Sequence, residues 1–387
     1  MKTFLKAAAI AALAGISLPS FALAQTQGGA IDVATIGEPP TLDPMTSTAD
    51  LVGIITQHMF ETLYTFDANW AVAPLLAADM PEISEDGTVY TIALREGVTF
   101  HDGSDMTAED VVASLERWLR IASRGMQTAE TVESVEAVDD YTVQITLSGS
   151  YAPLLSLLSL NNSAAIVIPS EIAGEDVMDD FVGTGPYQLA ERRPDQYIQL
   201  TRFDDYASRD EDANGYGGGR NQYLDEIRFV PVPDPNTRIE GAVAGQFDYV
   251  DSIAVEAYDR IASGNTEPVM LAPFGCPVFV MNTAEGVNSD IAVRKAIQAA
   301  LAPQDMLLAA FGSEDFFTAD GAMYPEGYVW HTEAGTEPYK PMGDTEMASQ
   351  LLADSSYDGS PLRILTSRQY EFHYTMAQVA EAYFEAA

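Results

Sequence analysis

The sequence has few of the residues that hold a fold together covalently or through a metal ion. Cys276 is the only cysteine among 387 residues, so no intramolecular disulfide can form and a sufficient core has to hold the fold. The four histidines are scattered, without a His-x-x-x-His pair or a cysteine partner. We therefore expect no metal site and no cofactor.

Positive charge is scarce too. Asp and Glu number 58 against 19 Lys and Arg, which gives a formal net charge of −39 at pH 7. A surface of this kind repels nucleic acid and anionic membranes, so we expect no nucleic-acid partner. The acidity is typical of a solvated surface more than of a dedicated cation-binding surface.

Long hydrophobic runs are missing, although a short one marks the N-terminus. Two lysines precede the apolar stretch from Ala7 to Leu18, and Ala22-Leu23-Ala24 follows as a small-residue cleavage pattern. The stretch is shorter than the about 20 residues that span a bilayer. We therefore predict a cleaved signal peptide over residues 1–24 and a periplasmic location.

Motifs for enzyme chemistry are absent as well. The sequence has no Gly-x-Ser-x-Gly elbow, and a Ser-His-Asp triad cannot be recognised without geometry. The segment Asp210 to Gly215 begins like a calcium loop, but its twelfth position is Asn221, where a bidentate glutamate is needed. The glycines at 217–219 favour a flexible, solvated connector, and no Lys-Ser or Lys-Thr follows them to hold a phosphate. We expect that the protein is not an enzyme.

What is present is a mixture of short strands and helices without a repeat. Alternating apolar residues predict strands at 31–36, 89–94, 142–147, 198–202 and 227–232, and a further short strand in the EGVTF segment at 96–100. Helical spacing predicts helices at 49–62, 237–244 and 291–301, one capped by Thr107, and a last one whose apolar face lies between Met376 and Phe384. The mixture predicts an α/β (mixed α+β) chain.

Seven segments form a recognisable set in their order and spacing. They are GEPPTLDP near the mature start, HMFETLYTFD at 58–67, YTIALREGVTFHDGSDMTAEDVVASLERW at 90–118, VGTGPYQL at 182–189, LDEIRFVPVPDPNTRIEGAVAGQFDYVD at 224–251, VFVMNTAEG at 278–286 and IAVRKAIQAAL at 291–301. Over essentially all of the mature chain, the set resembles the extracytoplasmic solute-binding proteins of ABC importers. The class is the one that binds oligopeptides, dipeptides, nickel and opines, known as family 5.

The resemblance implies a two-lobed, periplasmic-binding-protein-like type II fold. Lobe I would take residues 25–272, with an extra subdomain at 63–175, and lobe II would take residues 273–387, beginning near a VFVMNT strand. Family members continue well beyond this length. The resemblance therefore implies a fragment, with lobe II incomplete and the segment that returns to lobe I absent.

The function implied by the resemblance is capture of a small peptide or similar solute between lobes that close about a hinge. The partners would be an ABC permease and ATPase complex in the inner membrane, and the protein would act as a monomer. Other interpretations stay open: an opine, a glycoside or a metal chelate as the solute, a sensor that hands its ligand to a receptor, or a secreted hydrolase of unrecognised fold.

The candidate ligand-binding residues are those on loops that the family uses. They are Ser47, Thr48, Asp50, Arg124, Met126, Asn161, Asn162, Phe274, Cys276, and, after an LRILTS strand, Arg368 and Tyr370. Some have structural alternatives, since Asn162 and Asp50 can cap turns and Phe274 can belong to the core. Gly183 and Gly185 are expected to meet a backbone requirement, because glycine permits a positive φ.

The stretch REGVTFHDGSDMTAED at 95–110 looks like an acid–base or metal site when its residues are taken singly. As a unit, it predicts a turn at Asp102-Gly103 followed by the helix that Thr107 caps. His101 is then an exposed turn residue in the scaffold. We predict that replacing it with alanine leaves ligand affinity nearly unchanged.

Overall fold

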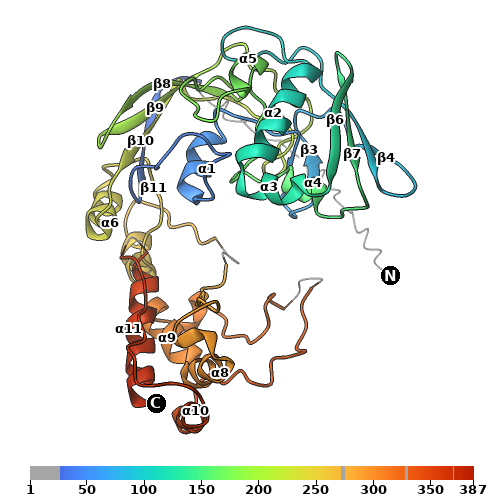
Figure 1. Ribbon diagram of the computed structural model, residues 1–387. Coiled ribbons are helices and arrows are strands. Elements are labelled where there is room, and N and C mark those ends of the chain that lie inside the picture. The colour runs from blue at the N-terminus through green and yellow to red at the C-terminus, as the bar shows by residue number, and fades with distance from the viewer. Residues whose placement is uncertain (1–26, 272–274, 327–329, 369) are drawn as a thin grey trace, which may run out of the picture.

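The computed structural model describes residues 27–271, 275–326, 330–368 and 370–387, and the predicted signal peptide lies outside these ranges. The described chain forms an upper body that contains the sheets and a lower body built on helices (Figure 1). The lower helices are α8 (Ile291–Ala300), α9 (Pro303–Phe311), α10 (Thr345–Ala353) and α11 (Glu371–Ala386). The division into lobes at 25–272 and 273–387, with the subdomain at 63–175, stays a prediction.

The main sheet of the upper body has five strands in the order β11-β1-β10-β9-β8. Their bounds are β1 (Ala30–Thr35), β8 (Tyr187–Arg193), β9 (Tyr197–Arg202), β10 (Glu226–Pro231) and β11 (Tyr249–Val250). β1 runs parallel to β10 and β11, whereas β8, β9 and β10 are antiparallel. Three of the predicted strands are thereby confirmed, because alternating apolar side chains place one face of each strand in the core.

A second sheet lies on the other side of the upper body, in the order β4-β5-β7-β6. It consists of β4 (Glu82–Ile83), β5 (Val89–Ala93), β6 (Val132–Asp139) and β7 (Thr142–Leu147), and a separate hairpin pairs β2 (Tyr64–Phe66) with β3 (Val72–Pro74). Helix α2 (Ala108–Ile121) packs on β6 and β7. One core joins both sheets, since Val33, Trp118 and Val143 belong to the same buried cluster.

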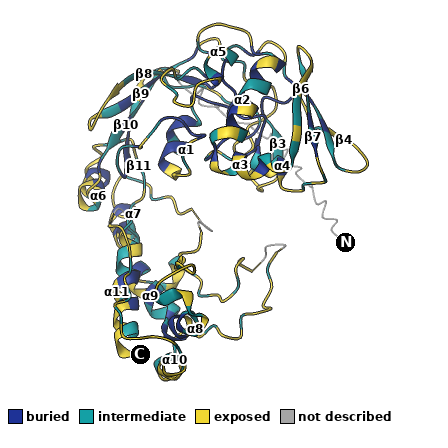
Figure 2. Cartoon of the chain, in the orientation of Figure 1, coloured by how far each residue is buried: buried dark blue, intermediate teal, exposed yellow. Residues whose placement is uncertain are grey.

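Shorter helices connect these layers. They are α1 (Asp50–Thr56), α3 (Ser123–Ala129), α4 (Leu154–Leu157), α5 (Ser170–Ala173), α6 (Pro235–Ala244) and α7 (Tyr258–Ala262). In the lower body α10 packs on α8 and α11 packs on α9. The predicted apolar face of α11 is confirmed, because Met376, Ala377 and Ala380 are buried. Buried residues are concentrated in the upper body (Figure 2).

Several predicted elements are wrong in extent or kind. α1 ends at Thr56 instead of residue 62, because Thr62 pairs with Ile166. The EGVTF segment is no strand and makes only a bridge from Thr99 to Asp105. The VFVMNT and LRILTS segments belong to no helix or strand, and Val280 is 92% exposed. A strand needs a neighbouring strand for its hydrogen bonds, and neither segment pairs with a strand in the part that the structure describes.

Candidate functional site

The His101 ring fastens two segments of the upper body. Its Nε2 lies 2.9 Å from the Gly185 carbonyl oxygen, and its Nδ1 accepts a 3.2 Å hydrogen bond from the Gly183 N–H. The ring also packs edge-on against Phe203, with 5.0 Å between the ring centroids. The predicted exposed position is therefore wrong: His101 is half-buried, and burial lowers its pKa. Both ring nitrogens are occupied by scaffold contacts.

The two glycines bonded to His101 are needed for close approach. A Cβ at Gly183 would lie 2.2 Å from the Met59 carbonyl oxygen, and one at Gly185 would lie 2.6 Å from the His58 carbonyl oxygen. The expected backbone requirement is confirmed, but its reason is different, since neither glycine has a positive φ.

Several predicted site residues meet around Asn162, although they come from three separate segments. Arg124 Nη1 donates to the Asn162 carbonyl oxygen at 2.7 Å and also to its side-chain oxygen. Asn162 Nδ2 in turn donates to the Thr48 carbonyl oxygen at 3.3 Å and to Asp50 Oδ1 at 3.4 Å. We call Ser47, Thr48, Asp50, Arg124 and Asn162 the Asn162 cluster.

Ser163 holds the three segments of the Asn162 cluster in place. Its N–H donates to the Ser47 carbonyl oxygen at 2.7 Å, and its hydroxyl accepts a 3.2 Å bond from the Arg124 N–H. Its carbonyl oxygen accepts a 2.7 Å bond from the buried Trp118 indole. Ser163 has φ +47, a left-handed conformation that costs free energy for a residue other than glycine. The hydrogen bonds of Ser163 therefore hold its backbone in this strained conformation.

Arg124 is the cation of the Asn162 cluster, and it makes no ion pair with any described residue. Partial burial lowers its pKa, and the charge of Asp50 opposes that shift. Arginine remains charged under these conditions, since its pKa starts above about 12. The unused N–H groups of this guanidinium can therefore bind an anionic group.

The other predicted site residues are more scattered. Tyr370, at the start of α11, packs against the main core, and burial followed by the charge of Asp50 raises its pKa. Arg368 is exposed and bonds to the Tyr374 hydroxyl at 2.8 Å. Met126 and Cys276 are also exposed. Phe274 lies outside the described residues.

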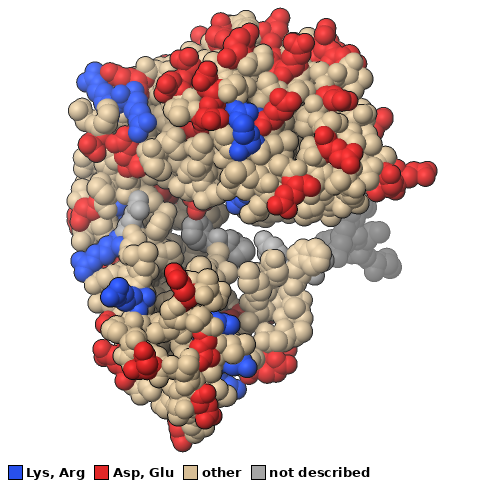
Figure 3. All heavy atoms as spheres, viewed as in Figure 1, with Lys and Arg blue, Asp and Glu red and all other residues tan. Residues whose placement is uncertain are grey.

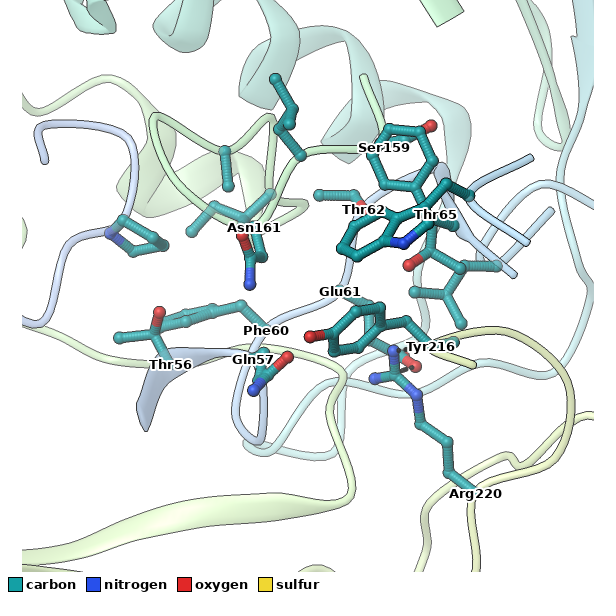
Figure 4. A pocket seen from close by; sticks show the side chains of 17 residues that line it. Thr56, Gln57, Phe60, Glu61, Thr62, Thr65, Ser159, Asn161, Tyr216 and Arg220 are labelled. Carbon is teal, nitrogen blue, oxygen red and sulfur yellow. Dashed lines mark hydrogen bonds and ion pairs between the residues drawn. The ribbon is translucent and has the colours of Figure 1, made fainter. Parts of the chain in front are cut away.

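A pocket that the sequence did not indicate opens beside the Asn162 cluster. It has a cavity volume of about 90 Å³ and is lined from α1, the β2–β3 hairpin, the segment after α4 and the segment before β10. Figure 4 shows Asn161, Gln57 and Tyr216 extending their polar ends toward the same opening. We call it the Trp70 pocket, because Trp70 and Tyr216 are its most exposed aromatic rings.

The floor of the Trp70 pocket carries a buried carboxylate that is fully bonded. Glu61 accepts hydrogen bonds from Thr184 Oγ1 at 3.0 Å and from the Tyr206 hydroxyl at 2.8 Å. Arg220 Nη1 lies 3.4 Å from Glu61 Oε1 and forms an ion pair with it. Burial and then this carboxylate raise the pKa of Tyr206. The opposite charges of Glu61 and Arg220 leave the floor neutral overall.

The glycine-rich loop at 210–219 positions Tyr216 at this pocket. The predicted flexible connector is wrong, because the loop packs tightly on the β2–β3 turn: a Cβ at Gly215 would lie 2.4 Å from the Ala68 nitrogen. Tyr216 N donates to the Phe66 carbonyl oxygen at 3.0 Å. Gly215 also has φ +62, which glycine adopts without strain. No local signal in the sequence indicates this packing, because Gly215 meets Ala68 only in the folded chain.

The described part of the chain offers neither a metal site nor a membrane span. No group of His, Cys, Asp and Glu side chains there could hold a metal ion, and none of its helices is long and apolar enough to cross a membrane. Figure 3 shows acidic residues spread over the visible face, with Lys and Arg in small groups.

The mixed sheet with helical layers and a second helical body defines the two-lobed periplasmic-binding-protein fold. The structure of the periplasmic binding protein AgaA of A. tumefaciens R10, in complex with agropinic acid, superposes with a TM-score of 0.74 at 25% identity, over 92% of this chain and 71% of that one. The peptide-bound DppA of Helicobacter pylori matches with a TM-score of 0.74 at 23% identity, over 93% and 72%. The predicted fold class is confirmed.

The chain belongs to the bacterial extracellular solute-binding proteins, family 5, whose middle-region sequence model matches residues 71–387. A probable peptide ABC transporter periplasmic-binding protein of Sinorhizobium fredii is 26% identical over 97% of this chain and 72% of its own length. The glutathione-binding protein GsiB of Salmonella paratyphi A is 26% identical over 88% of this chain and 65% of its own. The chain thus spans about two thirds to three quarters of these relatives.

Proposed function

We propose that the protein captures a small peptide, or a similar carboxylate-bearing solute, between two lobes and delivers it to an ABC permease and ATPase complex in the inner membrane. Membership of the solute-binding family supports this, as do relatives named for peptide and glutathione binding. We further propose export by the signal peptide at 1–24, a monomeric state, and binding without chemical conversion. Closure would then depend only on the solute's greater affinity for the closed state.

The observation that carries the proposal is that the Arg124 guanidinium has donors left for a solute. A guanidinium presents five N–H donors in a planar fork that matches a carboxylate, and among the described residues the Arg124 guanidinium bonds only through Nη1, toward Asn162. Every unmodified peptide has a terminal carboxylate. Arg124 would bind this group, and Ser47, Thr48, Asp50 and Asn162 would align the solute beside it. Met126, Phe274, Cys276, Arg368 and Tyr370 stay predicted contacts.

Opines are a second candidate class of solute. They are favoured by the match to AgaA, whose structure contains agropinic acid. Both classes offer a carboxylate to Arg124, so they differ in the groups that surround it. A binding comparison therefore has to include both.

Calorimetric titration of di- and tripeptides, glutathione and agropinic acid tests the function. We expect saturable binding of at least one solute, weakened about 10- to 100-fold in the Arg124→Gln variant, because a hydrogen bond to a charged group is lost. Arg120→Gln is the matched control, since Arg120 is exposed and pairs with Asp176 at 3.2 Å. Absence of binding by the whole panel, or equal weakening in both variants, would contradict the proposal.

A further inference from the structure

We propose that the Trp70 pocket is a subsite for an aromatic side chain of the bound peptide. The inference rests on the proposed function and adds the chemical class of residue that the site prefers. Asn161 and Asn162 are consecutive, yet Asn162 bonds to Arg124 whereas Asn161 lines the pocket. One short peptide can therefore place its carboxylate at Arg124 and a neighbouring side chain in the pocket.

The walls of the pocket offer stacking surfaces. Trp70 is 63% exposed and Tyr216 is 44% exposed, with their ring centroids 6.4 Å apart, and Phe66 lies 5.9 Å from Trp70. Large exposed aromatic rings grouped around a cavity are unusual on a solvated surface, since each costs hydration free energy. Rings at these separations can accept another ring in an offset or edge-on arrangement.

The backbone of Trp70 is strained in a way that presents its side chain. Its φ is +60, which is an outlier for a bulky residue. Asp67 enforces the turn, because Oδ1 accepts bonds of 2.8 and 2.9 Å from the N–H groups of Asn69 and Ala71. Glycine would adopt this conformation without strain, so the tryptophan is retained at a cost to stability.

The polarity of the pocket selects among side chains. Glu61 and Arg220 neutralise each other, which gives a charged side chain no partner there. The Asn161 amide and the Tyr216 hydroxyl make no hydrogen bond to any described residue and point into the opening (Figure 4). A ring that carries a hydroxyl group can stack on the aromatic walls and can also form a hydrogen bond with the Asn161 amide or the Tyr216 hydroxyl. Tyrosine is therefore preferred, followed by phenylalanine.

Affinities for Ala-Tyr-Ala and Ala-Ala-Ala, measured by calorimetry, test the subsite. We expect the tyrosine peptide to bind about tenfold more tightly, a difference of about 1.4 kcal/mol, because its ring stacks on the Trp70 and Tyr216 rings. Trp70→Gly should abolish this preference without lowering Tm, since it relieves the turn. Trp330→Phe is the matched control, because Trp330 is 70% exposed in the lower body.

Fluorescence reports occupancy directly. Trp118 is 1% exposed, so in the Trp330→Phe variant the indole that acrylamide can quench is Trp70. Ala-Tyr-Ala should protect it, and Ala-Ala-Ala should not. If neither peptide binds while another solute of the panel does, the subsite is refuted and the proposed function stands; if no solute of the panel binds, the proposed function fails as well. If both bind equally, or if Trp70→Gly lowers Tm and weakens both peptides alike, the subsite is refuted while peptide binding stands.

Discussion

At the residue scale, two contacts of one imidazole ring join the turn after β5 to the segment before β8. The ring nitrogens of His101 face the Gly185 carbonyl oxygen and the Gly183 N–H. Loss of the ring would leave both backbone groups without a partner in a half-buried place. Such groups cost about 1–3 kcal/mol each when they stay unsatisfied and water cannot replace the partner.

We expect His101→Ala to lower the free energy of unfolding by about 2 kcal/mol or more, since two backbone groups lose their partner, and to leave solute affinity nearly unchanged. Urea denaturation measures the first quantity and calorimetric titration the second. His331→Ala serves as the control, because that ring bonds only to the Tyr324 carbonyl oxygen among the described residues. A large loss of affinity without loss of stability would restore a binding role for His101.

His58 should make stability depend on pH. Its ring lies among Tyr187 and Phe229, and burial, followed by the charge of Arg220, lowers its pKa to about 4. Between about pH 6.5 and 4 the unfolded chain binds a proton that the folded chain does not. The free energy of unfolding should therefore fall as pH decreases through this window, by up to about 3 kcal/mol, and show no contribution above it.

Urea denaturation of the wild type and of His58→Gln between pH 7.5 and 4.5 isolates this effect. Other histidines and the carboxylates contribute equally to both proteins, so the difference between their curves belongs to His58. The wild type should lose stability more steeply on acidification. Parallel curves would show that the folded His58 titrates like an exposed histidine.

At the element scale, Asp110 lies in the first turn of α2 and bonds this helix to α5. Its Oδ2 accepts 2.9 Å bonds from the Thr107 N–H and hydroxyl, which completes the predicted capping box. Its Oδ1 accepts a 2.9 Å bond from the Ser170 N–H, across 60 residues of sequence. The cap could be predicted because its partners are three residues apart, whereas the bond to α5 exists only in the folded chain.

We expect Asp110→Ala to lower the free energy of unfolding by about 2 kcal/mol or more, because it leaves the Thr107 N–H without its half of the capping box and the Ser170 N–H unpaired. Glu109→Ala is the matched control, since the neighbouring acid is exposed and makes no hydrogen bond or ion pair with α5. Thermal denaturation compares the two variants. Equal effects would mean that Asp110 acts only through its charge at the helix N-terminus.

The predictions were right for strands with alternating apolar residues and for helices with a capping residue close by in the sequence. β1, β7 and β10 follow from alternation, and α8 begins at Asp290, whose side chain accepts from the Ala292 N–H at 2.8 Å. The VFVMNT and LRILTS segments have equally suitable residues and form no ladder among the described residues. Strand propensity does not supply a partner, and pairing is decided by what lies alongside.

At the scale of the whole molecule, the excess of acid should oppose folding. The net charge is −39. The acidic groups lie closer together in the folded protein than in the unfolded chain, so they repel each other more strongly in the folded protein. Salt reduces the Debye length from about 30 Å at 0.01 M to about 10 Å at 0.1 M, which weakens this repulsion.

We therefore expect Tm at pH 7.5 to rise as NaCl increases from about 0.01 to 0.5 M, because screening favours the compact state. Differential scanning calorimetry measures the rise. At pH 4.5 part of the carboxylates is neutral, and the rise should be smaller. A Tm that falls with salt at pH 7.5 would show that the ion pairs of the fold outweigh the general repulsion.

The sequence by itself determined the family, three of the five strands of the main sheet (β1, β9 and β10) and the helix that Thr107 caps, because these depend on residues close together in the chain. It also named the members of the Asn162 cluster, but by resemblance and without their contacts. Only the tertiary structure brought Asn162 to Asp50 across 112 residues and Arg220 to Glu61 across 159. Contacts between residues so far apart in the chain depend on how the sheets and helices pack, and no local sequence pattern predicts them. The same packing placed His101 in the scaffold and created the Trp70 pocket.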